Sequence, residues 1–200
     1  METDDLIRAL ATDVAIRESP VERRFGAALA GGFAVTVALF LATLGLRPHL
    51  ISLLGEPRIA FKFLVSLSLA IPAGLLVLRL TRPGTAVPWW VLGLAPILLV
   101  LASVAELGVV PSSRWEECLV GTYAKFCLIS VPLLSLPLLA GALLALRHGA
   151  PTRPALAGVT AGLFAGGLAA AVYAMHCPDD SPLFVATWYT LAILIVAALG

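Results

Sequence analysis

The chain has 200 residues, of which 60% are hydrophobic and only 12% are charged, and its formal net charge is +1. Soluble domains carry about twice that share of charged residues, so the composition is typical of an integral membrane protein with little soluble mass. The small net charge gives no indication of nucleic-acid binding, and no direct nucleic-acid partner is expected. The first apolar run follows an acidic segment and is too long for a secretory signal, so we expect it to remain as a membrane span.

Residues 1–24 form the only sizeable polar segment. Within it, Leu6, Ile7, Leu10 and Val14 recur at helical spacing, and most charged residues lie off that face. The pattern predicts a short cytoplasmic amphipathic helix. Its apolar face either rests on the membrane surface or binds a partner protein, and the pattern alone leaves both interpretations open.

Six apolar segments follow, and each is long enough to cross about 30 Å of hydrocarbon. They cover approximately residues 25–46, 63–80, 87–107, 126–146, 155–175 and 183–200. The predicted fold is therefore all-α: a six-helix transmembrane bundle over residues 25–200, preceded by the short amphipathic helix.

The distribution of lysine and arginine sets the expected orientation in the lipid bilayer. With the N-terminus in the cytoplasm, the inside segments hold the larger share, namely Arg8, Arg17, Arg23, Arg24, Arg79, Arg82, Arg147 and Arg153. Both termini are therefore expected to be cytoplasmic.

The fifth segment carries a stripe of small residues, with Gly158, Gly162 and Gly166 spaced four apart. Helices in lipid gain no hydrophobic free energy from associating, and a stripe of this kind lets a partner helix pack closely. We expect this helix at the centre of the bundle. The first segment has a similar ladder of small residues from Gly26 to Ala42, so we expect it to pack against the fifth.

The sequence contains no glycine-rich phosphate loop, no His-Glu-x-x-His and no Cys-x-x-Cys. An ion path needs several facing charges inside the membrane, and Glu106 alone is expected to be a solvated residue at the membrane boundary. We therefore expect neither an enzyme nor a cofactor.

The three cysteines, Cys118, Cys127 and Cys177, all fall on the expected non-cytoplasmic side, where bacterial disulfides can form. Counted from the turn that their helices share, Cys127 and Cys177 lie roughly 28 and 33 Å along neighbouring spans, which is nearly the same height. One interpretation is a redox pair of these two thiols, with Cys118 as an alternative or resolving partner. The other is that Cys127 is a small buried apolar residue. Together with His176, the thiols also offer ligands to a thiophilic metal ion, in a spacing that matches no known zinc motif.

Several segments together resemble the NrsF-like membrane anti-sigma factors, which are bacterial regulators of extracytoplasmic-function sigma factors. They are residues 5–13, 127–137, 145–154, 173–178 and 184–189, including Ala-Leu-Arg-x-Gly-Ala-Pro-Thr-Arg-Pro and Tyr-Ala-Met-His-Cys-Pro. The resemblance covers essentially the whole chain.

This resemblance implies a six-span protein of the bacterial inner membrane whose N-terminal segment holds a sigma factor. It also implies an outward-facing cysteine pair that senses oxidative or heavy-metal stress and releases the sigma factor. Carried over residue by residue, the pair falls on Cys127 and Cys177. The sigma-binding face falls on Leu6, Ile7, Leu10 and Val14.

Two other functions are less consistent with the sequence. Kinked spans and glycine stripes are compatible with a small transporter or channel-like protein, but the shortage of buried charge and of a visible inverted repeat counts against it. A membrane thiol oxidoreductase needs a low-pKa cysteine with a close partner, and the absence of Cys-x-x-Cys disfavours it.

Overall fold

In the computed structural model, the described residues are 3, 5, 21–48, 50–53, 55–81, 86–147, 149 and 151–200. They form helices and turns and contain no strand. The predicted sigma-binding face of Leu6, Ile7, Leu10 and Val14 lies outside the described residues, so that assignment stays a prediction.

Within the described residues, six helical stretches are long and apolar enough to cross a membrane, as the sequence predicted. The long helices are α2 (Val21–Thr43), α4 (Pro57–Leu80), α5 (Leu94–Val109), α7 (Ala124–Leu146), α8 (Pro154–Ala174) and α10 (Thr190–Leu199). Shorter elements join or extend them: α3 (Leu50–Leu53), η1 (Trp89–Gly93), η2 (Ser112–Arg114), α6 (Trp115–Val120), α9 (Pro182–Phe184) and the π-helical η3 (Val185–Tyr189). The helix α4 begins six residues earlier than its apolar pattern indicates, because Pro57 opens it and its first two turns carry Arg58 and Lys62.

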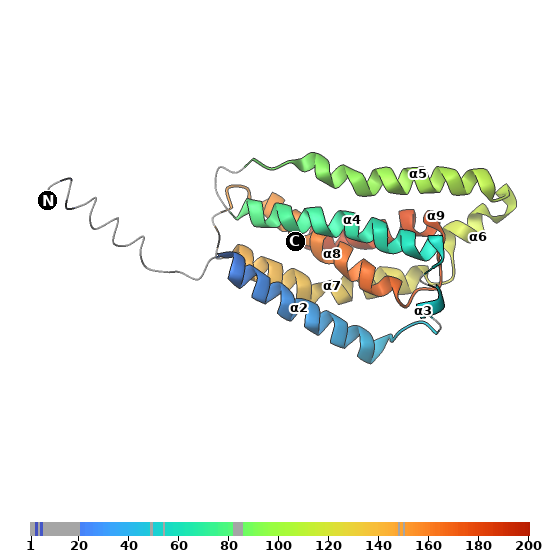
Figure 1. The fold of residues 1–200 in the computed structure, drawn as a ribbon, viewed down its shortest axis with the longest axis horizontal. Helices are drawn as coiled ribbons and strands as arrows, with labels where there is room; N and C mark the ends of the chain where they lie inside the picture. The colour runs from blue at the N-terminus through green and yellow to red at the C-terminus, as the bar shows by residue number, and fades with distance from the viewer. Residues whose placement is uncertain are drawn as a thin grey trace.

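The fifth apolar segment, α8, lies at the centre of the bundle, as expected. In its apolar window 72% of the residues are buried, against 11% for the windows of α2 and α5. The helices α4, α7 and α10 pack around α8, while α2 and α5 lie on the outside (Figure 1).

The small-residue stripe of α8 faces α10 at close range. A Cβ atom added at any of the three glycines would meet the backbone of α10 or of the residue that caps it: Gly162 faces Ala197 at 2.5 Å, Gly166 faces Ile193 at 3.3 Å, and Gly158 faces the cap residue Gly200. The two helices approach this closely because these positions of α8 have no side chain.

The expected packing of the first span against the fifth is wrong. The helix α2 packs along α7 instead. A Cβ atom added at Gly32 of α2 would lie 2.7 Å from the carbonyl oxygen of Pro137, and one added at Gly141 of α7 would lie 2.7 Å from that of Ala28. The face of α2 that packs on α7 carries Gly32, Thr36 and Phe40, whereas the small-residue ladder from Gly26 to Ala42 is exposed and is not the packing face.

All three cysteines lie toward the end of the bundle where α2, α5 and α8 finish and α4 and α7 begin (Figure 1). We call this end the thiol end. Residues 175–181, which we call the α8–α9 loop, run across it and carry Cys177.

Candidate functional site

The α8–α9 loop is held by groups from other parts of the chain. At its start, the backbone N–H of Arg47 donates to the carbonyl of Met175 at 3.0 Å. The Nδ1 atom of His176 lies 3.2 Å from the carbonyl oxygen of Gly45. Both contacts come from the segment that follows α2, so the loop and the end of α2 are joined.

A buried lysine binds the loop at Cys177. The ammonium of Lys62, on α4, donates to the carbonyl of Cys177 at 2.9 Å and forms an ion pair with Asp180 at 2.6 Å. The other oxygen of Asp180 accepts a hydrogen bond from Arg47 at 2.8 Å. The side chain of Lys62 is 0% exposed, and a buried charge of this kind is tolerated only when it is paired. We call Arg47, Lys62 and Asp180 the Asp180 clamp.

The neighbouring carboxylate fixes the loop to α7. The Oδ2 atom of Asp179 accepts the backbone N–H groups of Thr122 at 2.9 Å and Tyr123 at 2.7 Å, directly before α7 begins. The positive end of a helix dipole favours a carboxylate there. Gly121 adopts a positive φ of 60°, and a Cβ atom added there would lie 2.5 Å from the ring of Phe184.

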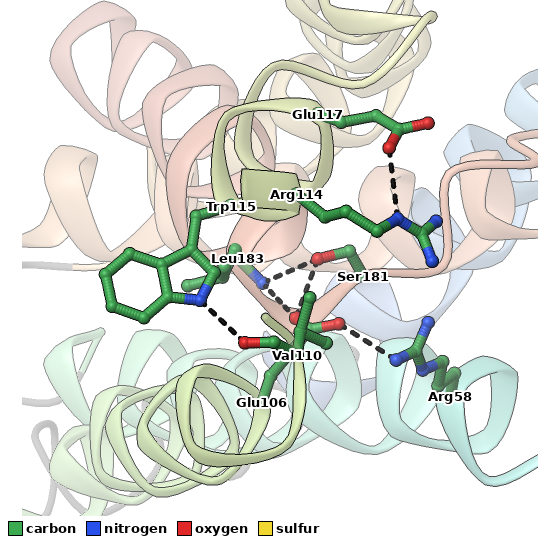
Figure 2. A network of polar contacts seen from close by, with 8 residues as sticks. All are labelled: Arg58, Glu106, Val110, Arg114, Trp115, Glu117, Ser181 and Leu183. Atoms are coloured by element: carbon green, nitrogen blue, oxygen red, sulfur yellow. Dashed lines mark hydrogen bonds and ion pairs between the residues drawn. The ribbon is translucent and has the colours of Figure 1, made fainter. Parts of the chain in front are cut away.

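A third carboxylate, that of Glu106, connects α5 to the same region (Figure 2). Its Oε2 atom accepts the hydroxyl of Ser181 at 2.7 Å and the backbone N–H of Leu183 at 3.1 Å. Its Oε1 atom forms an ion pair with Arg58 of α4 at 3.1 Å.

The expectation that Glu106 is a solvated boundary residue is therefore wrong. Its side chain is 3% exposed, and Ser181, Leu183 and Arg58 replace water as its partners. The start of α9 offers a free backbone N–H group because the first N–H groups of a helix have no partner within it.

Two of the cysteines share one apolar cluster. Cys127, in the first turn of α7, and Cys177 are both 0% exposed, and Tyr173 and Tyr189 lie in the same cluster. Burial raises the pKa of the Cys177 thiol, while the nearby ammonium of Lys62 acts in the opposite direction. The structure thus brings together the two thiols that the sequence proposed as a pair, and both are free thiols here.

The third cysteine is placed differently. Cys118, on α6, is half-buried and lines an open cavity of about 640 Å³. Asp179 and Asp180 of the α8–α9 loop also line this cavity, together with Arg58 and Arg114. The loop that covers Cys177 therefore borders a cavity that small molecules can enter.

The metal-ligand set of Cys118, Cys127, His176 and Cys177 is not assembled. Within the described ranges, no three His, Cys, Asp or Glu side chains come close enough to hold a metal ion. The imidazole of His176 contacts the backbone at Gly45, and Cys118 lines the cavity while the other thiols are buried.

The polar contacts of the thiol end were not predicted from the sequence. No contact was expected for Arg47, Arg58 or Lys62, although Lys62 directly precedes an apolar segment. The adjacent pair Asp179-Asp180, directly after Cys177, was the available signal, because two carboxylates beside an apolar cluster require cationic or N–H partners.

Comparison with known proteins gives a consistent result over the whole chain. The family described as "NrsF: Negative regulator of sigma F" matches residues 10–200. Two curated relatives are each 36% identical over all of this chain and 95% of their own length: the probable anti-sigma-F factor NrsF of Azospira oryzae and the anti-sigma-F factor NrsF of Caulobacter vibrioides. No solved structure matches the chain. The chain therefore belongs to the NrsF family of negative regulators of sigma F.

Proposed function

We propose that this chain is a membrane-embedded anti-sigma factor of the bacterial inner membrane. It holds sigma F, acting as an extracytoplasmic-function sigma factor, through residues 1–24, and releases it when Cys127 and Cys177 respond to oxidative or heavy-metal stress. The observation that carries the proposal is the 36% identity, over the full chain, to two anti-sigma-F factors.

The surface of the helices supports a lipid environment. The outer helix α5 exposes Ile97, Val100, Leu101 and Val104, each by more than half of its surface. Soluble proteins rarely expose contiguous apolar patches of this kind, whereas lipid-facing helices do. With both termini in the cytoplasm, the thiol end faces the other side of the membrane.

The contacts of the α8–α9 loop support a connection between the thiols and the N-terminal segment. Residues 1–20 precede α2 in the chain, and the far end of α2 leads to Gly45 and Arg47, which bind the loop beside Cys177. A stimulus shifts an equilibrium only if it favours one of two states. A bond made at Cys177 changes the packing of this loop and meets that condition.

Sigma-factor capture can be tested by a pull-down from solubilised membranes, with this protein as bait and mass spectrometry as the readout. Deleting residues 1–20, or combining Leu6→Ala with Leu10→Ala, should abolish recovery of the sigma factor. The matched control, Asp4→Ala with Asp13→Ala, changes residues off the apolar face and should retain it. Membrane insertion is checked by resistance to alkaline extraction.

Retention of the sigma factor by the Leu6/Leu10 double variant would show that the proposed face is wrong. Recovery of no sigma factor by the intact, inserted protein would overturn the anti-sigma proposal and favour the transporter alternative. Release is tested with diamide or cadmium added to the immobilised complex. Cys127→Ala and Cys177→Ala should block release, while Cys118→Ala should release normally.

A further inference from the structure

We propose that the Asp180 clamp keeps the α8–α9 loop closed over Cys177 and thereby sets how fast this thiol reacts. Arg47, Lys62 and Asp180 are positioning residues in this proposal, because they act through the loop and not on a reagent. The regulatory consequence rests on the proposed function, whereas the control of thiol access does not.

The first support is where the clamp binds. The loop has no regular secondary structure of its own between α8 and α9. Among the side chains that bind it in the described structure, Lys62 is the one whose donor meets the carbonyl of Cys177 itself, at 2.9 Å. The same ammonium holds Asp180, three residues further on, at 2.6 Å. The lysine thus fixes the loop on both sides of Pro178.

The second support is the burial of the charges. Lys62 is 0% exposed, and the side chains of Arg47 and Asp180 are 23% and 19% exposed. Removing the carboxylate would leave an ammonium buried without its counter-charge, which is strongly unfavourable. The least costly response is for the loop to move so that water reaches Lys62. That movement also uncovers Cys177, since Lys62 holds its carbonyl.

The third support is the route for water and reagents. The open cavity of about 640 Å³ is lined by Pro178, Asp179 and Asp180, so it borders the loop directly after Cys177, which does not itself line the cavity. Cys127 lies inside α7 and does not belong to the loop. Opening of the clamp should therefore expose Cys177 before Cys127.

The experiment measures the rate at which N-ethylmaleimide labels Cys177 in the full chain in native membranes. A Cys118→Ala background removes the accessible thiol, and peptide mass spectrometry reads Cys177 and Cys127 separately. We expect Asp180→Asn to raise the labelling rate of Cys177 by about tenfold or more, since hydrogen bonds to charged groups are lost. Arg47→Met should give a smaller rise, and Asp180→Glu, which keeps the charge, should restore part of the protection.

The matched control is Lys125→Met, which removes an exposed cation at the same end of the bundle, outside the lining of the cavity. Its labelling rate should equal that of the parent chain. Wild-type labelling of Cys177 in Asp180→Asn would overturn the proposal. An equal rise at Cys127 would mark general unfolding of that variant, and the milder Arg47→Met then decides. In Arg47→Met, a selective rise in the labelling rate of Cys177 supports the clamp, and any other result refutes it.

The same variants separate this proposal from the proposed function. With a working sensor, Asp180→Asn should release the sigma factor at a lower diamide concentration than the parent chain. Faster labelling without diamide-dependent release leaves the clamp standing and refutes the sensor. Diamide-dependent release with unchanged labelling refutes the clamp alone.

Discussion

The carboxylate of Glu106 should be a main stabilising contact between α5 and the rest of the bundle. Replacing Glu106 with alanine removes a charged acceptor from the hydroxyl of Ser181 and the N–H of Leu183, and the ion pair with Arg58. Hydrogen bonds to charged groups contribute about 1.5–3 kcal/mol each, and a buried polar group left without a partner costs a similar amount.

Two features of the site reduce the free energy that the loss of these contacts should cost. The N–H of Leu183 retains the Ser181 hydroxyl as an acceptor at 3.2 Å, and Arg58 is 55% exposed, so water can solvate it. We therefore expect Glu106→Ala to lower the free energy of unfolding by about 2–4 kcal/mol. Glu106→Gln should cost less, because an amide oxygen in the place of Oε2 can still accept both hydrogen bonds and only the ion pair with Arg58 is lost.

The assay is denaturant unfolding of the purified protein in detergent, followed by circular dichroism. The matched control is Glu117→Gln, whose side chain is 72% exposed and whose pairing with Arg114 should contribute less than about 0.5 kcal/mol. Hydrogen exchange should show faster exchange of the Leu183 N–H in Glu106→Ala. If Glu106→Ala unfolds within about 0.5 kcal/mol of the parent chain, the attribution of stability to these contacts is refuted.

Three further expectations concern backbone approach and protonation. Gly162→Leu should destabilise the protein by at least about 1–3 kcal/mol, since its Cβ would meet Ala197 of α10. The control is Gly31→Leu on α2, whose Cβ would meet no atom within 4 Å and which should be neutral in the same unfolding assay. Gly121→Ala should cost more than Gly45→Ala. Both glycines have a positive φ, which costs other residues about 1–3 kcal/mol, but only at Gly121 would the added Cβ also meet Phe184, and equal losses would contradict this reasoning. Burial raises the pKa of Cys177 above its ordinary 9.0, so the unfolded chain loses this proton at a lower pH than the folded chain does. The free energy of unfolding should therefore hold below pH 9 and then fall by up to about 1.4 kcal/mol per pH unit. Unfolding curves from about pH 7 to 10 should show a smaller slope for Cys177→Ala.

The apolar helices could be predicted from the sequence because a membrane span needs a long uninterrupted apolar run, which is a local property. The central place of α8 could be predicted because its glycine stripe is also a local property of the sequence. Which helix packs against which could not be predicted in this way. Ala28 and Gly32 of α2 meet α7, while the ladder from Gly26 to Ala42 is exposed. This outcome depends on the rotation of α2 about its axis, which spacing alone does not fix.

The polar contacts of the thiol end were beyond sequence reasoning for a different reason. Lys62 and the carbonyl of Cys177 are 115 positions apart, and Glu106 and Ser181 are 75 apart. A single sequence carries no signal for such pairs. The charges of Lys62 and Glu106 indicated only where the apolar segments begin and end, and Glu106 was therefore expected to be solvated.

These long-range contacts have a role that apolar packing cannot fill in this protein. In the lipid bilayer that we propose for this chain, lipid would solvate an apolar side chain as well as a neighbouring helix does, so apolar contacts would only weakly fix how far one helix slides along another. Lys62, Asp179 and Glu106 do so, because each is tied to a particular N–H, carbonyl or charged group on a different element. Since these partners converge on the loop that carries Cys177, the register of α4, α5 and α7 depends on the shape of that loop. A covalent change at this thiol is therefore well placed to alter the arrangement of several helices at once.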